Sequence, residues 1–284
     1  MIQQSQRQSG GLSTRLKAMA NEGRSLIDDS SKSESNLNAA MIDYILPYAE
    51  KTIAEHLPPG TQVDHLTKIT LYDLQCEFYK TGRGNIPNDI NKKVFIKPDG
   101  GIITATTPDG VKYPLLISED KVQGTNDQRR AEQKERQATG NAIERAAKNI
   151  RTCEMLCAHV NYFPYLLFAS GCDFHISETI SKRIVMMNMG TPNHYVDIAP
   201  TSSENDIEIA VDNIVNSLDI RKKWGHCCIA TAVVKAHKWN EMPHLTSLWR
   251  KEEYVRICCK AIDLAVQQII YLRTESETSI EMEL

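Results

Sequence analysis

Two turn sequences in the first half of the chain constrain its fold most strongly: PDGG at 98–101 and PDG at 108–110. They separate three β-rich runs, at 94–96, 102–106 and 113–118. Proline pre-sets the φ angle of a turn, and glycine adopts conformations that other residues avoid, so each of these sequences reverses the chain. The pattern predicts neighbouring strands joined by tight turns.

Helical and strand patterns alternate along the rest of the sequence. Apolar residues recur at helical spacing in 37–56, 66–79 and 254–272. Short apolar runs at 165–169 and 227–234 are typical of buried strands. Because helices flank a few central strands, the order predicts a single α/β domain with a central mixed β-sheet flanked by helices.

Composition divides the chain into three parts. Residues 1–35 are rich in Gln, Ser, Gly and Asn, and we expect them to form a flexible N-terminal arm. The folded domain is expected over 36–273. Residues 274–284 contain four glutamates, which indicates an acidic C-terminal tail.

The overall charge narrows the classes of function. The 284 residues carry a net charge of −3, which excludes a uniformly basic nucleic-acid coat protein but allows a local basic face. The sequence contains no apolar run of the roughly 18 residues needed to cross a bilayer. Its N-terminus lacks the apolar segment of a signal peptide. We therefore expect a soluble, cytoplasmic protein without a membrane partner.

The cysteines give little sign of a metal site. There are eight, none in a C-x-x-C pair, which argues against a zinc ribbon. In a cytosolic chain they are expected to be reduced. The sequence His226-Cys227-Cys228 is followed by an apolar run, so we interpret these cysteines as buried thiols of a core strand rather than ligands.

The residues best suited to catalysis lie at the ends of the predicted hairpin. Asp99 follows Pro98, and Glu119-Asp120-Lys121 comes twenty residues later. Side chains alternate along a strand, so Glu119 and Lys121 share a face and the hairpin can return Asp99 beside Glu119. Two carboxylates with substrate phosphate and water suit Mg²⁺, for which Mn²⁺ is a possible substitute. Lys121 can orient the attacking water or stabilise charge on the phosphate.

This pattern predicts phosphodiester hydrolysis, yet it also has a structural interpretation. Aspartate is common in PDGG turns for reasons of turn geometry alone. A Glu-Asp-Lys sequence at the end of a strand also fits a solvated edge. The motif by itself leaves both interpretations open.

A second feature is the GNAIER sequence at 140–145. It lies within a basic segment, 121–151, that has eight basic and four acidic residues. Asn141 can bond bidentately to adenine in the major groove, and Ala142 can meet a thymine methyl group. Arg145 lies four residues after Asn141, on the same helix face. An N-capped surface helix with ordinary charge spacing is the structural alternative.

Several sequences occur together in one order: IKPDGG, the E-x-K at 119–121 followed by QG, and GNAIER followed by KNI. FPYLLF at 163–168 and the N-x-G-x-P at 188–192 come next. Over about residues 90–195 this combination resembles the EcoRI family of type II restriction endonucleases. The resemblance implies the PD-(D/E)xK fold and a homodimer that cuts double-stranded palindromic DNA with Mg²⁺.

The resemblance also implies roles for individual residues. Asp99 and Glu119 would be metal ligands, with the backbone carbonyl of Asp120, and Lys121 would be the catalytic lysine. DNA-embracing arms are expected near 122–140 and 176–195. The residues implied to contact DNA are Gln123, Gln137, Ala138, Gly140, Asn141, Ala142, Glu144, Arg145, Lys148, Lys182 and Arg183. A DNA methyltransferase acting in the same system, as a functional rather than physical partner, would protect the host's own sites.

Some positions depart from the family pattern. The segment between Lys121 and Gly140 is short, Gln137 replaces an expected Met, and Ile180 replaces an expected arginine. Arg183 or Lys182 matches a second arginine. The resemblance implies that GNAIER reads an AATT core. It also implies that the departing positions read the outer base pair, so GAATTC is the first expectation and CAATTG or a relaxed AATT-containing site are the alternatives. Four-base 5′ overhangs are expected by the same analogy.

Two other functions fit the same fold. One is a repair or structure-specific nickase or resolvase, which would read DNA shape, so that GNAIER would have no role in reading bases. The other is a DNA-binding protein without catalysis. That function predicts a broken metal site, whereas Asp99, Glu119 and Lys121 are all present.

Overall fold

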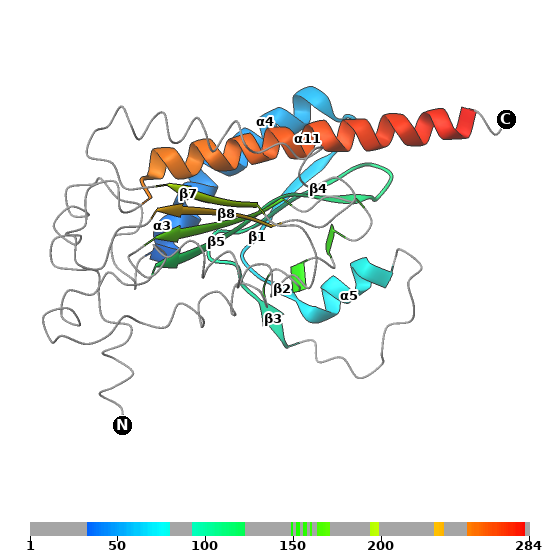
Figure 1. Ribbon diagram of the computed structural model, residues 1–284. Helices are drawn as coiled ribbons and strands as arrows, with labels where there is room; N and C mark the ends of the chain where they lie inside the picture. Colours follow the sequence, from blue (N-terminus) through cyan, green and yellow to red (C-terminus); the bar gives the residue numbers. More distant parts are fainter. Residues whose placement is uncertain are drawn as a thin grey trace, which may run out of the picture.

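The computed structural model describes residues 33–79, 93–122, 149, 152–153, 156–157, 160, 164–170, 194–198, 230–235 and 249–281. Within these ranges, six strands form one sheet in the order β1-β4-β5-β6-β8-β7, and the C-terminal helix α11 (Lys251–Glu281) and the N-terminal helices lie along it (Figure 1). The strands are β1 (Gln62–Leu66), β4 (Gly101–Thr106), β5 (Lys112–Val122), β6 (Tyr165–Ser170), β7 (His194–Ile198) and β8 (Ala230–Lys235). The predicted α/β class with a mixed sheet is confirmed.

The sheet changes character at β5. β4 pairs antiparallel with β1 and with β5, whereas β5, β6, β8 and β7 run parallel to one another. Parallel strands need crossover connections that cover both faces, so their residues are buried on both sides. Residues 113–120 of β5 are accordingly all buried. Of the predicted catalytic residues, Glu119 and Lys121 therefore lie on the strand where the sheet changes from antiparallel to parallel, and Asp99 lies in the turn before β4.

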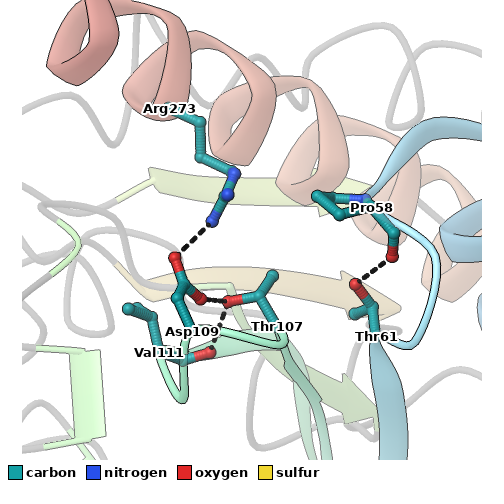
Figure 2. A network of polar contacts seen from close by, with 6 residues as sticks. All are labelled: Pro58, Thr61, Thr107, Asp109, Val111 and Arg273. Atoms are coloured by element: carbon teal, nitrogen blue, oxygen red, sulfur yellow. Dashed lines mark hydrogen bonds and ion pairs between the residues drawn. The ribbon is translucent and has the colours of Figure 1, made fainter.

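The PDG turn at 108–110 joins β4 to β5 as predicted. Gly110 has a φ of 81°, and its N–H donates to the Thr107 carbonyl at 2.8 Å. The Thr107 hydroxyl donates to Asp109, and Arg273 of α11 donates to the other Asp109 oxygen at 3.0 Å (Figure 2). The hydrogen bond from Thr107 is the main reason why the pKa of Asp109 is lowered, and the interaction with Arg273 lowers it further. The far end of the hairpin is thus tied to α11.

The predicted helix at 37–56 is present but contains a wider turn. It consists of α3 (Ser33–Ala40), the π-helical segment η1 (Met41–Ile45) and α4 (Leu46–His56). The Leu46 N–H donates to the carbonyl of Met41, five residues earlier. Pro47 follows, and its ring has no N–H and crowds the preceding turn of an α-helix. The π segment widens that turn, so the helix passes the proline without ending.

The predicted helix at 66–79 is wrong in its first turn. Two short strands, β2 (Ile69–Thr70) and β3 (Phe95–Ile96), pair as a separate antiparallel sheet, and α5 (Leu71–Tyr79) follows β2. The Asp73 N–H donates to the Thr70 hydroxyl at 3.0 Å, and that hydroxyl donates to the Asp73 carboxylate at 2.6 Å. This reciprocal cap fixes the start of the helix after Thr70. The run at 94–96 therefore pairs with β2 and not with β4.

The C-terminal helix α11 (Lys251–Glu281) packs on β5 and on α4. It continues past residue 273, where the acidic tail was expected to begin, because no glycine or proline interrupts residues 251–281. Tyr48 of α4 donates to Asp263 of α11 at 2.7 Å. Burial, together with that aspartate, raises the pKa of Tyr48 to about 12.

Other expectations fall partly outside the described residues. Of the expected N-terminal arm, 33–35 already belong to α3, and 1–32 are not described. Of the expected arm near 176–195, only 194–195 are described, and they begin β7, a strand that was not predicted. The His226-Cys227-Cys228 sequence is also outside, and β8 begins at Ala230. No helix in the described part of the chain is long and apolar enough to span a membrane.

An aromatic cluster joins α11 to the sheet. The ring of Phe168 in β6 lies 5.2 Å from that of Trp249 and 4.7 Å from that of Tyr254, measured between centroids. All three side chains are buried. Replacing Phe168 by alanine should lower the free energy of unfolding by about 3–5 kcal/mol, because a large cavity is left in a packed core. Urea unfolding followed by circular dichroism measures this change.

Phe95→Ala is the matched control. Phe95 also lies in a strand, but half of its surface is exposed, and Lys68 lies over its ring at 5.2 Å. Its loss should cost less than about 1 kcal/mol. Equal costs for the two variants would show that the aromatic cluster contributes no more than an exposed ring.

Candidate active site

The PDGG turn lies directly against β5. The Gly101 N–H donates to the Pro98 carbonyl at 3.0 Å and closes the turn. The Gly100 N–H donates to the Ser118 carbonyl at 2.9 Å, and Gly101 pairs with Ser118 in the β4–β5 ladder. Asp99 is thereby held next to Glu119. The prediction that the hairpin returns these two carboxylates to one place is borne out by this geometry.

The two carboxylates share a reciprocal set of contacts. The Asp99 N–H donates to Oε2 of Glu119 at 3.3 Å. The Asp120 N–H donates to Oδ2 of Asp99 at 3.2 Å. Each carboxylate is thus oriented by the backbone of the other segment, and the two acidic groups lie side by side.

A third donor comes from outside the hairpin. Asn149, whose backbone is helical, donates its side-chain amide to Oε1 of Glu119 at 3.1 Å. Glu119 is only 2% exposed, so its charge depends on these hydrogen bonds for compensation. Both of its carboxylate oxygens accept a hydrogen bond within the protein.

The charges of Glu119 and Asp99 also affect the pKa of a buried tyrosine. Tyr165 of β6 is fully buried, and burial is the main reason why its pKa lies well above the usual value. The charges of Glu119 and Asp99 raise the pKa further, which places the phenol within the field of both. Tyr165 therefore stays an uncharged side chain in the electrostatic field of the two carboxylates.

The turn is also packed tightly from behind. Ser118 and Tyr254 of α11 share a hydrogen bond of 2.8 Å between their hydroxyl groups. A Cβ atom added to Gly100 would collide with the Tyr254 hydroxyl and would lie 2.9 Å from the Ser118 side chain. There is no room for a side chain here, so the glycine at position 100 is explained by contact with α11 and not by turn geometry alone.

The donor set fits a divalent cation. Two carboxylates converge, one of them almost completely buried, and hard oxygen ligands of this kind suit Mg²⁺ or Mn²⁺. The Asp120 carbonyl stands next to them in the chain as a further oxygen. Among the described residues, no three His, Cys, Asp or Glu side chains come together as a metal site, so the side-chain ligands offered here are the two carboxylates of Asp99 and Glu119.

The remaining predicted residues are only partly described. Lys121 lies two residues after Glu119 on β5 and pairs with Ala169, so its backbone position is that of the predicted E-x-K strand. The predicted DNA-contacting residues all lie outside the described part of the chain: Gln123, Gln137, Ala138, Gly140, Asn141, Ala142, Glu144, Arg145, Lys148, Lys182 and Arg183. Their predicted roles stay predictions.

The model of the protein family described as restriction endonuclease EcoRI matches residues 88–259, which are more than half of the chain. The chain belongs to the EcoRI restriction endonuclease family. The match contains both carboxylates, the E-x-K strand and the GNAIER sequence. The resemblance inferred from these motifs is confirmed.

Two relatives within the EcoRI family are similar over shorter stretches. The type II restriction enzyme EcoRI of Escherichia coli is 37% identical over 95 residues, which are 30% of this chain and 34% of that protein. The type II restriction enzyme RsrI of Cereibacter sphaeroides is 32% identical over 87 residues, which are 28% of this chain and 31% of that protein. The chain spans about a third of the length of each of these curated relatives.

Three contributors to this EcoRI-family site were not predicted from the sequence: Asn149, Tyr165 and Tyr254. Asn149 occurs in the KNI sequence after GNAIER, and Tyr165 in FPYLLF, yet neither was assigned a role. The signal for Tyr165 was a hydroxyl group within an otherwise apolar stretch, whereas Asn149 stands among charged residues and was not marked out in this way. Tyr254 gave no local signal, because its partner is 136 positions away.

The turn also contacts a histidine, which makes the stability of this region dependent on pH. Nε2 of His65 in β1 lies 3.4 Å from the Gly100 carbonyl. Burial lowers the pKa of His65, although this hydrogen bond opposes the effect. As the pH falls below about 6.5, the unfolded chain binds a proton on this residue that the folded protein does not. Stability present above that pH should therefore be lost as the pH falls toward the lowered pKa.

His65→Gln removes this titration while keeping a polar side chain. We expect the loss of unfolding free energy between about pH 7.5 and about pH 5.5 to be smaller in this variant than in the wild type. Urea unfolding at both pH values measures it. The same loss in both proteins would contradict the assignment of the pH dependence to His65.

Proposed function

We propose that the chain is a type II restriction endonuclease that hydrolyses phosphodiester bonds in double-stranded DNA. The observation that carries the proposal is the pairing of Asp99 with Glu119 across the PDGG turn, with Lys121 next on the same strand. Membership of the EcoRI family supports it.

Asp99, Glu119 and the Asp120 carbonyl would hold Mg²⁺, with Mn²⁺ as a substitute. When bound, such an ion polarises the phosphoryl oxygen and makes a bound water more acidic. Asp99 and Glu119 are kept in place for this by the backbone N–H groups of each other's segments. Pre-set ligand geometry of this kind avoids reorganisation during the reaction.

Lys121 is the proposed catalytic lysine. Side chains alternate along a strand, so the E-x-K spacing predicts that Lys121 shares a face of the sheet with Glu119. There it orients the attacking water and stabilises the negative charge that develops on the phosphate.

Sequence recognition is assigned to the GNAIER segment. Asn141 and Ala142 would read A·T pairs in the major groove, Arg145 would lie on the same helix face, and Glu144 would buttress them. An AATT core follows from this assignment. We place GAATTC first, with CAATTG or a relaxed AATT site as alternatives and four-base 5′ overhangs.

A homodimer is part of the proposal, since a two-fold dimer presents one reading element to each half of a palindrome. A cell that contains such a nuclease in its cytoplasm must also protect its own sites. A DNA methyltransferase of the same specificity is therefore the implied functional partner.

The test is digestion of a fully sequenced plasmid by the purified protein with Mg²⁺, followed by sequencing of the ends. Discrete ends that share an AATT-centred palindrome are expected, and they identify the outer base pair. Random nicking would favour a repair or structure-specific nuclease. Absence of cleavage with both Mg²⁺ and Mn²⁺ would favour a non-catalytic DNA-binding protein.

Lys121→Ala should remove most of the cleavage and leave specific DNA binding largely intact. The reason is that the lysine acts on the attacking water and the phosphate charge, whereas the bases are read elsewhere. Single-turnover cleavage and a gel-shift titration measure the two properties separately. Wild-type turnover in this variant would rule out the catalytic assignment.

Asn141→Ala should lose about 1–3 kcal/mol of discrimination at one A·T pair, because a bidentate base contact disappears. Affinities for a panel of duplexes, each with one base pair of the site changed, measure this loss. Selectivity that stays the same across the panel would refute the reading role of Asn141.

A further inference from the structure

The Glu119 carboxylate is held from two directions. On Oε2 it accepts the Asp99 N–H at 3.3 Å, and on Oε1 it accepts the Asn149 side-chain amide at 3.1 Å. The first donor is a backbone group fixed by the PDGG turn. The second is a side chain from a different segment, thirty residues further along the chain.

Two hydrogen-bond donors, one on each oxygen, fix the rotation of the Glu119 carboxylate, which a single donor would leave free. The terminal torsion of a glutamate side chain is broad and roughly two-fold, so a single hydrogen bond permits rotation of the carboxylate about its last bond. With one donor on each oxygen, the plane of the carboxylate is defined. A carboxylate oxygen carries two lone pairs, so accepting one hydrogen bond does not by itself prevent it from binding a cation.

The inward position of Asn149 follows from the packing of its segment. Cys153, Leu156 and Cys157 have helical backbone and are all fully buried. Asn149 lies four residues before Cys153, the spacing of neighbours on one face of a helix. The burial of the side chains that follow it anchors the segment from which Asn149 reaches Glu119.

We propose that Asn149 is a positioning residue of the nuclease centre: its side-chain amide fixes the Glu119 carboxylate in the orientation that binds the divalent cation. The inference rests on the proposed function and deepens it. In this role Asn149 acts through Glu119, as groups behind metal ligands commonly do.

Asn149 lies close in the sequence to the segment that is assigned to base reading. It follows the last residue of GNAIER by four positions. The segment assigned to base reading thus continues into the side chain that orients a metal ligand.

The test compares Asn149→Leu, which keeps most of the side-chain volume but removes the donor, with the wild-type protein. Mn²⁺ is the probe, and its binding to the full-length protein is measured by electron paramagnetic resonance. The measurement is made with and without a GAATTC duplex that has phosphorothioate linkages throughout the site. We expect Mn²⁺ affinity to fall by about 10- to 100-fold.

A second readout is the Mg²⁺ dependence of single-turnover cleavage. The variant should need a higher Mg²⁺ concentration for half-maximal rate, while its affinity for the duplex without metal stays at the wild-type value. Asn149→Gln retains an amide and should regain part of the Mn²⁺ affinity. If the leucine variant does not fold, Asn149→Ala takes its place, with folding checked by thermal melting.

Cys157→Ala is the matched control, since it truncates a buried side chain of the same segment and leaves the Asn149 amide in place. It should lower the melting temperature and leave Mn²⁺ affinity unchanged. Wild-type Mn²⁺ affinity in the Asn149 variant would overturn the proposal, as would an equal loss in the control. Failure of the wild-type protein to cleave any DNA would overturn the proposed function instead, because Mn²⁺ binding is measured without cleavage.

Discussion

The hydrogen bond from the Gly100 N–H to the Ser118 carbonyl is the contact on which the site depends most. It fastens the PDGG turn to β5, so the register of the β4–β5 hairpin decides where Asp99 lies. A slip of one residue would turn Glu119 to the opposite face of the sheet. The tight PDG turn at 108–110, tied to Arg273 of α11, protects that register from the far end.

The same arrangement concentrates negative charge in a buried place. Desolvated carboxylates are costly unless they are paired or hydrogen-bonded, and the structure compensates them with two backbone amides and the amide of Asn149. Tyr165 adds no further charge, because burial and the charges of the two carboxylates keep its pKa high. Such a site is suited to a cation that arrives with a phosphate, since both neutralise part of the other's charge.

Local chemistry explains which parts of this molecule were predictable from its sequence. The turns, the strands beside them and the convergence of Asp99 with Glu119 all follow from residues within about twenty positions of one another. The start of α5 depends on a cap at Thr70 and on pairing of β2 with the distant β3, so helical spacing alone misplaced it. Asn149 and Tyr254 act on partners far away in the chain, and nothing near them in the sequence announces that contact.

The close contact between Gly100 and the Tyr254 hydroxyl has a consequence for how the protein is made. The surface behind the PDGG turn comes from a helix that is synthesised long after the turn itself. A nascent chain that ends before α11 contains both carboxylates but lacks the surface that holds their turn. The turn therefore reaches its supported state only after α11 has been made, and a product truncated before α11 would contain the two carboxylates without that support.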